Sequence, residues 1–247
     1  MTKRIILLFA ILCVASPASA EDYIKPDWTT LIRALVRFNA LTLSDDRLLD
    51  DYAAISECDL YRKLHSDDFK WQKVRDAIRE SMKMNIATFP TAFGYETSLQ
   101  LDRYDFPNKI FRFSQKTTIH NVNTITLFKF NRPVCGDVNV KYLPSFFRAV
   151  MDTPLYFDGL PLAQKDAEAL LKQMEATGNK DRIIYVRFNM HIVYIEPFQH
   201  MEMGGGDVML TQTNTKDGHI ARLDVHLDSA EFFEDEAMTK LIYELQP

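Results

Sequence analysis

The chain has 247 residues, of which 47% are hydrophobic and 26% are charged, and its net charge at pH 7 is −5. This is the composition of a folded globular protein rather than a disordered one. The acidic balance argues against nucleic acid and anionic membrane surfaces as partners, because both select a basic surface. The length fits one domain or two closely packed lobes.

The chain starts with the three parts of a bacterial signal peptide. Lys3 and Arg4 are positively charged, residues 5–14 are apolar, and Ala18-Ser19-Ala20 supplies the small residues that signal peptidase requires. We therefore expect residues 1–20 to be removed and a soluble mature protein to begin at Glu21, in the periplasm or outside the cell.

The apolar stretch of this signal peptide is too short to span a bilayer, which takes about 20 apolar residues. No later stretch is long enough, so no transmembrane segment is expected in the mature protein. A lipoprotein anchored at Cys13 is an alternative, but Leu12 stands where lipoprotein processing requires a small residue. Cleavage after Ala20 would remove two basic and no acidic residues and change the net charge from −5 to −7.

Residues 21–88 are predicted to form a helical segment, because apolar residues recur there at helical spacing. Three stretches show this pattern, and a start signal precedes each one: Pro26, then Ser44 with Asp45 and Asp46, then Ser66 with Asp67 and Asp68. Arg75, Arg79 and Lys83 lie four residues apart on one face of the third helix. This basic stripe could hold an anion, but a solvated helix face is the favoured interpretation.

Residues 89–247 are predicted to be rich in strands, because apolar and polar residues alternate after Pro90. The predicted strands lie at 99–106, 111–113, 125–130, 184–194, 208–213, 220–228 and 240–245, whereas 131–160 are less regular. A change of phase between Leu101 and Tyr104 indicates a bulge. Every even residue from Ile184 to Tyr194 is apolar, so this strand should bury one face.

Two connections complete the predicted fold. Asp217-Gly218 predicts a hairpin between strands 208–213 and 220–228. Residues 162–177 have helical spacing and Gly178 is placed to end that helix, whose apolar side can cover the sheet. The predicted class is α+β: an N-terminal helical segment followed by a largely antiparallel β-sheet with one covering helix, packed together as one domain.

Several stretches resemble a family of exported bacterial proteins known only as a domain of unknown function. They are Asp51-Tyr52-Ala53, Cys58-Asp59-Leu60-Tyr61, Asp68-Phe69-Lys70-Trp71-Gln72 and Tyr104-Asp105-Phe106. The resemblance extends over most of the mature chain. It implies export, but it implies no active site.

The usual catalytic motifs are missing from the sequence. It contains no G-x-S-x-G, no P-loop, no G-x-G-x-x-G after a strand, no H-E-x-x-H and no calcium-loop pattern. Gly204-Gly205-Gly206 precedes a strand without a lysine partner and is interpreted as a flexible connection. The acidic residues Glu231, Glu234, Asp235 and Glu236 fit a solvated loop, and His226 shares the outward face of Asp224 and Asp228 as an exposed histidine.

One cluster could bind copper outside the cytosol, because thioether sulfur and imidazole both suit that metal. It comprises Met190, His191, His200, Met201 and Met203. Strand alternation places Met190 and His191 on opposite faces, so Met190 is predicted to be a core residue. His200, Met201 and Met203 are placed in a loop and remain candidate ligands.

Cys58 and Cys135 are the cysteines left after signal removal and are predicted to form a disulfide, since export favours oxidation. The alternative is two separate buried thiols. No catalytic, cofactor-binding or metal residue is assigned.

The favoured function is a non-catalytic binding or assembly module with an unknown protein or small-molecule partner in the cell envelope. The alternatives are a hydrolase of unfamiliar type, with carboxylates and a histidine from separate strands, and a copper-binding protein.

Overall fold

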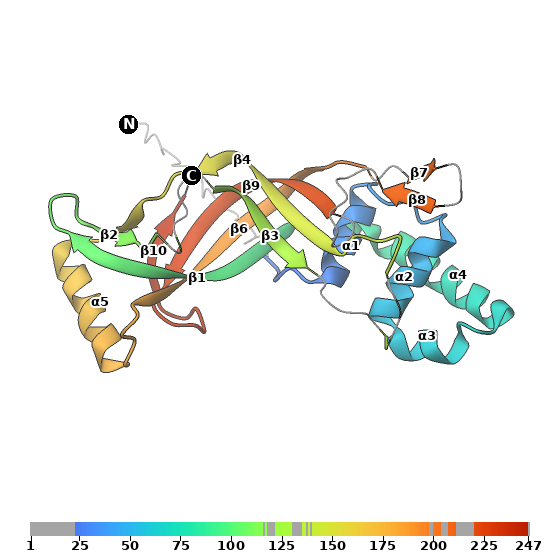
Figure 1. Ribbon diagram of the computed structural model, residues 1–247, viewed down its shortest axis with the longest axis horizontal. Coiled ribbons are helices and arrows are strands. Elements are labelled where there is room, and N and C mark those ends of the chain that lie inside the picture. Colours follow the sequence, from blue (N-terminus) through green and yellow to red (C-terminus); the bar gives the residue numbers. More distant parts are fainter. Residues whose placement is uncertain are drawn as a thin grey trace, which may run out of the picture.

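The computed structural model describes residues 23–115, 117, 122–129, 135–136, 138, 140–197, 200–203, 207–210 and 220–246. For 200–203 and 207–210 it describes the course of the backbone alone. Helices gather at one end of the molecule, a curled sheet forms the middle, and one more helix lies at the other end (Figure 1). The predicted signal peptide and Cys13 lie outside the described residues.

The N-terminal segment is helical, as predicted. Its helices are α1 Trp28–Arg37, α2 Asp46–Ser56, α3 Cys58–Leu64 and α4 Asp68–Asn85, and a 3-10 turn follows at Ile86–Thr88. The predicted caps Ser44 and Ser66 are wrong by one residue. Asp45 and Asp67 cap α2 and α4 instead, because a carboxylate both accepts a backbone N–H and meets the positive end of the helix dipole.

The strand-rich part forms one eight-stranded sheet in the order β3-β4-β9-β6-β1-β2-β5, with β10 beside β9. The strands are β1 Ala92–Asp105, β2 Ile110–Phe113, β3 Val122–Lys129, β4 Phe146–Leu155, β5 Gly159–Pro161, β6 Ile183–Ile195, β9 Ile220–Phe233 and β10 Leu241–Leu245. Neighbouring strands are antiparallel except β4 and β9, which are parallel. The predicted α+β class with a largely antiparallel sheet is confirmed.

The bulge predicted in β1 is confirmed, since the pairing with β2 shifts between Leu101 and Tyr104. The predicted burial of β6 holds from Ile184 to Ile192 but is wrong at Tyr194, which is 52% exposed. The pairing with β9 shifts register between Ile192 and Tyr194, so after this shift an odd-numbered residue of β6 faces the core instead of an even-numbered one. The consequence is that Ile195, rather than Tyr194, turns into the core.

The predicted hairpin between 208–213 and 220–228 is wrong. β8, Asp207–Leu210, pairs with β7, His200–Met203, in a separate two-stranded sheet, while β9 pairs with β4, β6 and β10. Asp217-Gly218 lies outside the described residues. The expected loop at 200–203 is therefore a strand, although the side chains of His200, Met201 and Met203 are outside the description.

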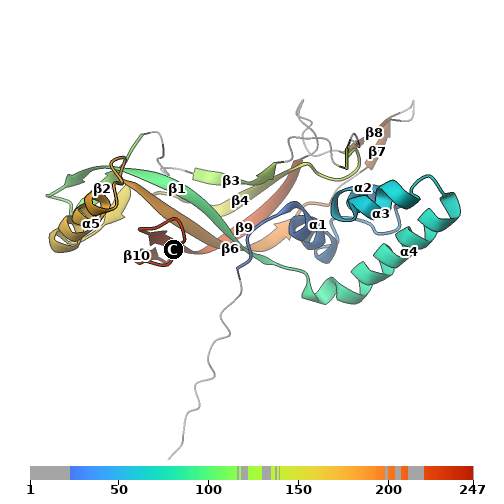
Figure 2. The ribbon, with the colours of Figure 1, turned by 90° about the horizontal axis from the view of Figure 1, so that it is seen from below.

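The main core lies between α1 and one face of the sheet (Figure 2). Leu31 and Leu35 of α1 are fully buried together with Phe93, Phe147 and Phe232 of the strands. Helix α5, Gln164–Ala176, buries Ala167, Leu170 and Met174 at the far end of the sheet and is followed by Gly178 at φ +75°. It corresponds to the predicted covering helix. No helix in the described part of the chain is long and apolar enough to cross a membrane.

Candidate functional site

A disulfide and a buried carboxylate connect α2 and α3 to the segment before β4. The predicted disulfide is present and joins Cys58, at the start of α3, to Cys135, with an S–S distance of 2.20 Å. The carboxylate of Asp51 in α2 accepts the backbone N–H groups of Lys141, Tyr142 and Leu143. These contacts hold α2 and α3 against the segment that leads into β4.

Asp51 is an unusual buried acid, with 6% of its surface exposed. Burial raises the pKa of Asp51 to about 6, and the three backbone N–H groups limit that rise because they favour the charged form. A buried carboxylate that satisfies three backbone donors is a structural anchor, since each donor would otherwise be left unpaired.

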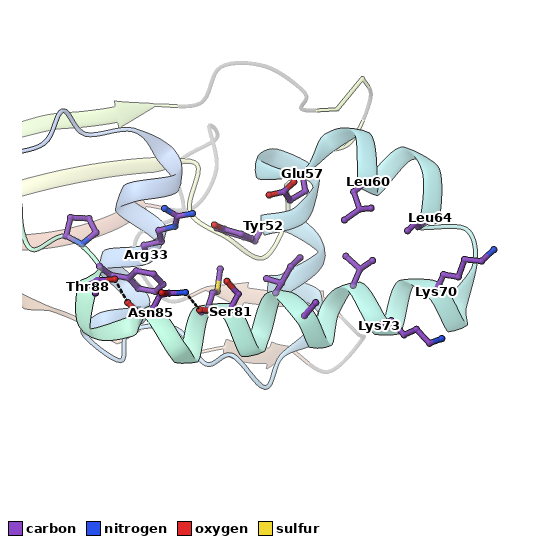
Figure 3. Close-up of a pocket in the computed structure, with 16 residues that line it drawn as sticks. Arg33, Tyr52, Glu57, Leu60, Leu64, Lys70, Lys73, Ser81, Asn85 and Thr88 are labelled. Atoms are coloured by element: carbon purple, nitrogen blue, oxygen red, sulfur yellow. Dashed lines mark hydrogen bonds between the residues drawn. The ribbon is translucent and has the colours of Figure 1, made fainter.

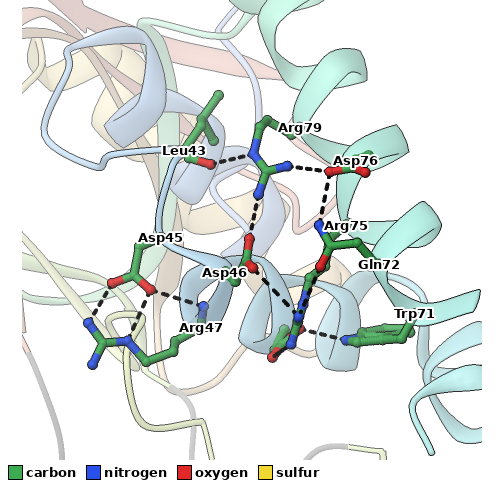
Figure 4. Close-up of polar contacts among 10 residues, drawn as sticks. Leu43, Asp45, Asp46, Arg47, Trp71, Gln72, Arg75, Asp76 and Arg79 are labelled. Atoms are coloured by element: carbon green, nitrogen blue, oxygen red, sulfur yellow. Dashed lines mark hydrogen bonds and ion pairs between the residues drawn. The ribbon is translucent and has the colours of Figure 1, made fainter. Parts of the chain in front are cut away.

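The basic stripe of α4 neither faces solvent throughout nor offers an anion site, because two of its members pair with α2 (Figure 4). Arg75 forms a bidentate ion pair with Asp50, with N–O distances of 2.7 and 2.6 Å. Arg79 contacts Asp46 and also Asp76 of its own helix. These pairs fix the position of α4 along one side of α2.

A long groove lies along an adjacent face of α4, between this helix and α2 with α3 (Figure 3). Its volume is about 790 Å³. The apolar lining side chains are Tyr52, Leu60, Leu64, Val74, Ala77, Ile78, Met82, Phe89 and Pro90. Val74, Ala77 and Ile78 of α4 and Leu60 of α3 are at least partly exposed to this channel, whereas Tyr52, Met82 and Phe89 are buried in the core at its base.

Charged side chains stand around this apolar channel: Arg33, Glu57, Lys70 and Lys73. Lys70 is paired with Asp67 at 2.7 Å. Arg33 is half-buried, and its guanidinium carbon lies 5.8 Å from the centre of the Phe89 ring. Among the described residues no carboxylate pairs with Arg33, so the inner end of the groove holds a positive charge without a counter-ion.

A second polar arrangement lies on the sheet face away from the core. Nδ1 of His226 in β9 lies 2.8 Å from Oδ2 of Asp152 in β4, and Nδ1 of His191 in β6 lies 2.7 Å from Oδ1 of Asp228. The hydrogen bond to Asp152 raises the pKa of His226, and the same contact lowers the pKa of Asp152. None of these four residues lines the groove.

The other candidates from the sequence are dispersed. Met190 is fully buried, as predicted. Glu231 lies within β9 beside Arg187, which corrects its placement in a loop, while Glu234 and Asp235 belong to the turn before β10. Gly204-Gly205-Gly206 lies outside the described residues. The groove and the histidine–aspartate pairs were not predicted.

The fold and the groove define an α+β protein that presents an open apolar channel between helices at one end. The family described as a domain of unknown function, DUF4852, matches residues 44–173, and the chain belongs to this family. The match includes all of α2, α3 and α4 and both cysteines of the disulfide. No curated protein and no solved structure matches the chain.

Proposed function

We propose that this protein is a non-catalytic binding module, exported from the cytosol, that holds a small anionic amphiphile in the groove between α4 and α2 with α3. The observation that carries the proposal is the groove itself. It combines an apolar channel with Arg33, a half-buried residue, at its inner end.

The size of the groove favours a small molecule. Ligand pockets in proteins have volumes of about 300–1,000 Å³ and are mostly apolar with a few polar groups that orient the ligand. The groove, at about 790 Å³, lies in this range. An acyl chain or a comparable apolar body would cover side chains such as Val74 and Ile78 that water now reaches.

The charge distribution favours an acidic head group. A guanidinium presents two parallel N–H donors to a carboxylate or phosphate, and such a contact gains strength where water is partly excluded. Arg33 is half-buried, whereas Lys73 at the other end is exposed. We therefore place the head group at Arg33 and the apolar body along α4.

The lining gives no support to the hydrolase alternative at this site. Among the described residues that line it there is no histidine, and Glu57 is the one carboxylate. The described part of the lining therefore offers no general base with an orienting partner, which hydrolysis at neutral pH commonly requires. The histidine–aspartate pairs lie on the sheet, away from a ligand in the groove.

Export is supported by the residue pattern of the first twenty positions and by the disulfide, which persists in oxidising compartments. Mass spectrometry of the protein from its native host should show a chain that begins at Glu21 and carries no lipid. A product that begins at Cys13 with acyl chains would contradict this.

Filling the groove should abolish binding. We expect Ala77→Phe to weaken the binding of a dansyl-labelled long-chain fatty acid by about tenfold or more, since a phenyl ring must compete with the chain for the same space. Titration of the mature, disulfide-intact protein, followed by dansyl emission, measures this. Ala176→Phe is the matched control, because Ala176 is also an exposed helical alanine but lies in α5.

The same titration tests the head-group contact. The wild-type protein should prefer the free acid over its methyl ester, and Arg33→Gln should remove that preference while Lys73→Gln retains it, because exposed charges contribute little. Equal binding by the Ala77→Phe and Ala176→Phe proteins would exclude the groove as the site. Equal affinity of the wild-type protein for acid and ester would exclude the anionic head group.

A further inference from the structure

We propose that His191 and His226 together bind a divalent transition-metal ion on the polar face of the sheet, with Cu²⁺ bound more tightly than Zn²⁺. This site is separate from the groove and does not depend on the function proposed for it.

The two histidines occupy facing positions on neighbouring strands. His191 of β6 and His226 of β9 are register partners in an antiparallel pair, and their ring centres are 5.2 Å apart. Facing residues of an antiparallel pair project from the same side of a sheet. β6 and β9 are interior strands with partners on both sides, so the backbone holds the two rings near each other before any ion arrives.

Each ring is also oriented by a carboxylate. Asp228 lies 2.7 Å from Nδ1 of His191, and Asp152 lies 2.8 Å from Nδ1 of His226. A carboxylate that accepts a hydrogen bond at Nδ1 places the proton of a neutral imidazole there and leaves the lone pair on Nε2. The carboxylate–histidine–metal arrangement of known sites has this form, and the carboxylate strengthens the nitrogen as a ligand.

The surroundings of the pair carry excess negative charge. Oδ2 of Asp228 is buried and has no hydrogen-bond partner among the described residues. Asp152 adds a second carboxylate, whereas the positive charge of Arg222 is directed to Asp224 at 2.8 Å. With both imidazoles neutral, a divalent cation at the two Nε2 atoms would offset the charges of Asp152 and Asp228.

The ring spacing suits a single ion. Metal–imidazole bonds are about 2.0–2.1 Å long, so two coordinating nitrogens lie at most about 4 Å apart. The two ring centres are 5.2 Å apart and the ring planes are inclined by 49°, so the rings are neighbours, and rotation of the side chains is required to direct both Nε2 atoms at one ion. In the described part of the chain no group of three or more histidine, cysteine or acidic side chains could hold an ion, so water must complete the coordination.

The choice of metal follows from the ligands. Imidazole nitrogen suits copper, zinc and nickel, and affinity for a given nitrogen site rises toward Cu²⁺ and falls again at Zn²⁺. A site with two nitrogens and water oxygens fits the tetragonal geometry of Cu²⁺. The thioether ligands considered from the sequence are not required, since Met190 is buried in the core on the opposite face.

Titration of the mature, disulfide-intact protein with CuSO₄, followed by calorimetry and by electron paramagnetic resonance, tests the proposal. We expect one Cu²⁺ per chain with two coupled nitrogens. His191→Gln and His226→Gln should each weaken binding by about tenfold or more and leave one coupled nitrogen, and Asp152→Asn should weaken it by about 10–100-fold through the orientation of His226.

His65→Gln serves as the matched control, because His65 is an exposed histidine at the end of α3 that stacks on Tyr61. It should bind copper as the wild-type protein does. Circular dichroism should be used to check that each variant is folded. The His226 side chain is exposed, so its replacement should leave the fold intact. Absence of stoichiometric binding, or binding that survives both His191→Gln and His226→Gln, would overturn the proposal.

Discussion

Replacing Cys58 and Cys135 together by serine should lower the free energy of unfolding by about 4.5 kcal/mol. The two residues are 77 positions apart. Cross-linking a loop of this length lowers the conformational entropy of the unfolded chain, which in the chain-entropy model stabilises the folded state by about 4.5 kcal/mol. Such a loss is a large part of a typical domain's stability. Denaturant unfolding of the mature wild-type and double-serine proteins measures it.

The control is the wild-type protein treated with a reductant, which should unfold at the denaturant concentration of the double-serine variant. Thiol labelling under denaturing conditions should find no free thiols per mature chain before reduction and two after it. Two free thiols before reduction would show that the bridge does not form. Unchanged unfolding of the variant would show that it does not stabilise the fold.

Replacing Asp51 by alanine should lower the free energy of unfolding by about 3 kcal/mol or more. The change leaves the N–H groups of Lys141, Tyr142 and Leu143 without their acceptor, and a buried donor left unpaired costs about 1–3 kcal/mol. Asp51→Asn keeps one acceptor oxygen and should have an intermediate effect. Asp59→Ala, at an exposed position in α3, should change stability by less than about 0.5 kcal/mol.

The pKa of Asp51 also predicts how its contribution depends on pH. This pKa is about 6 in the folded protein against 3.8 as the ordinary value, so the folded state binds the proton more tightly than the unfolded state does. The part of the stability that depends on protonation of Asp51 is therefore greatest below about pH 4 and is lost as the pH rises through about 6. The hydrogen bonds that Asp51 accepts from the three backbone N–H groups are a separate contribution. Asn does not titrate, so unfolding of the wild-type and Asp51→Asn proteins across this range isolates the effect.

Local patterns in the sequence predicted the features that depend on local physics. Alternation in β1 revealed the bulge near Leu101, and helical spacing followed by Gly178 located α5. The burial of Met190 followed from its place in an unbroken apolar series along β6. Each of these depends on a period of two or of 3.6 residues, which short stretches of sequence contain.

Features that depend on distant partners were not predictable in this way. β4 was missed within 131–160, and with it the parallel pairing to β9 and the contact between Asp152 and His226, which are 74 positions apart. The turn signal at Asp217-Gly218 did not determine the partner of β8. Strand pairing over such distances is decided by packing of the whole sheet rather than by residues near the turn.

The groove could not be predicted from the sequence either, because it depends on how separate helices pack. Val74 and Ile78 form an apolar helical stripe, which the sequence presents in the same form whether another element covers it or not. The stripe lines the open groove between α4 and α2 with α3, while the ion pairs of Arg75 and Arg79 hold α4 to α2 along an adjacent face (Figure 4). Neither the spacing nor the residue types of the stripe indicate whether another element covers it.

The most direct test of the proposed ligand groove is amide chemical-shift mapping of the mature, disulfide-intact protein during titration with a long-chain fatty acid. We expect the largest shifts at Arg33, in residues 52–64 and in residues 70–90, with small shifts in β6 and β9. Shifts that are centred on the sheet around His191 and His226, or no saturable shifts in the helical segment, would contradict the account.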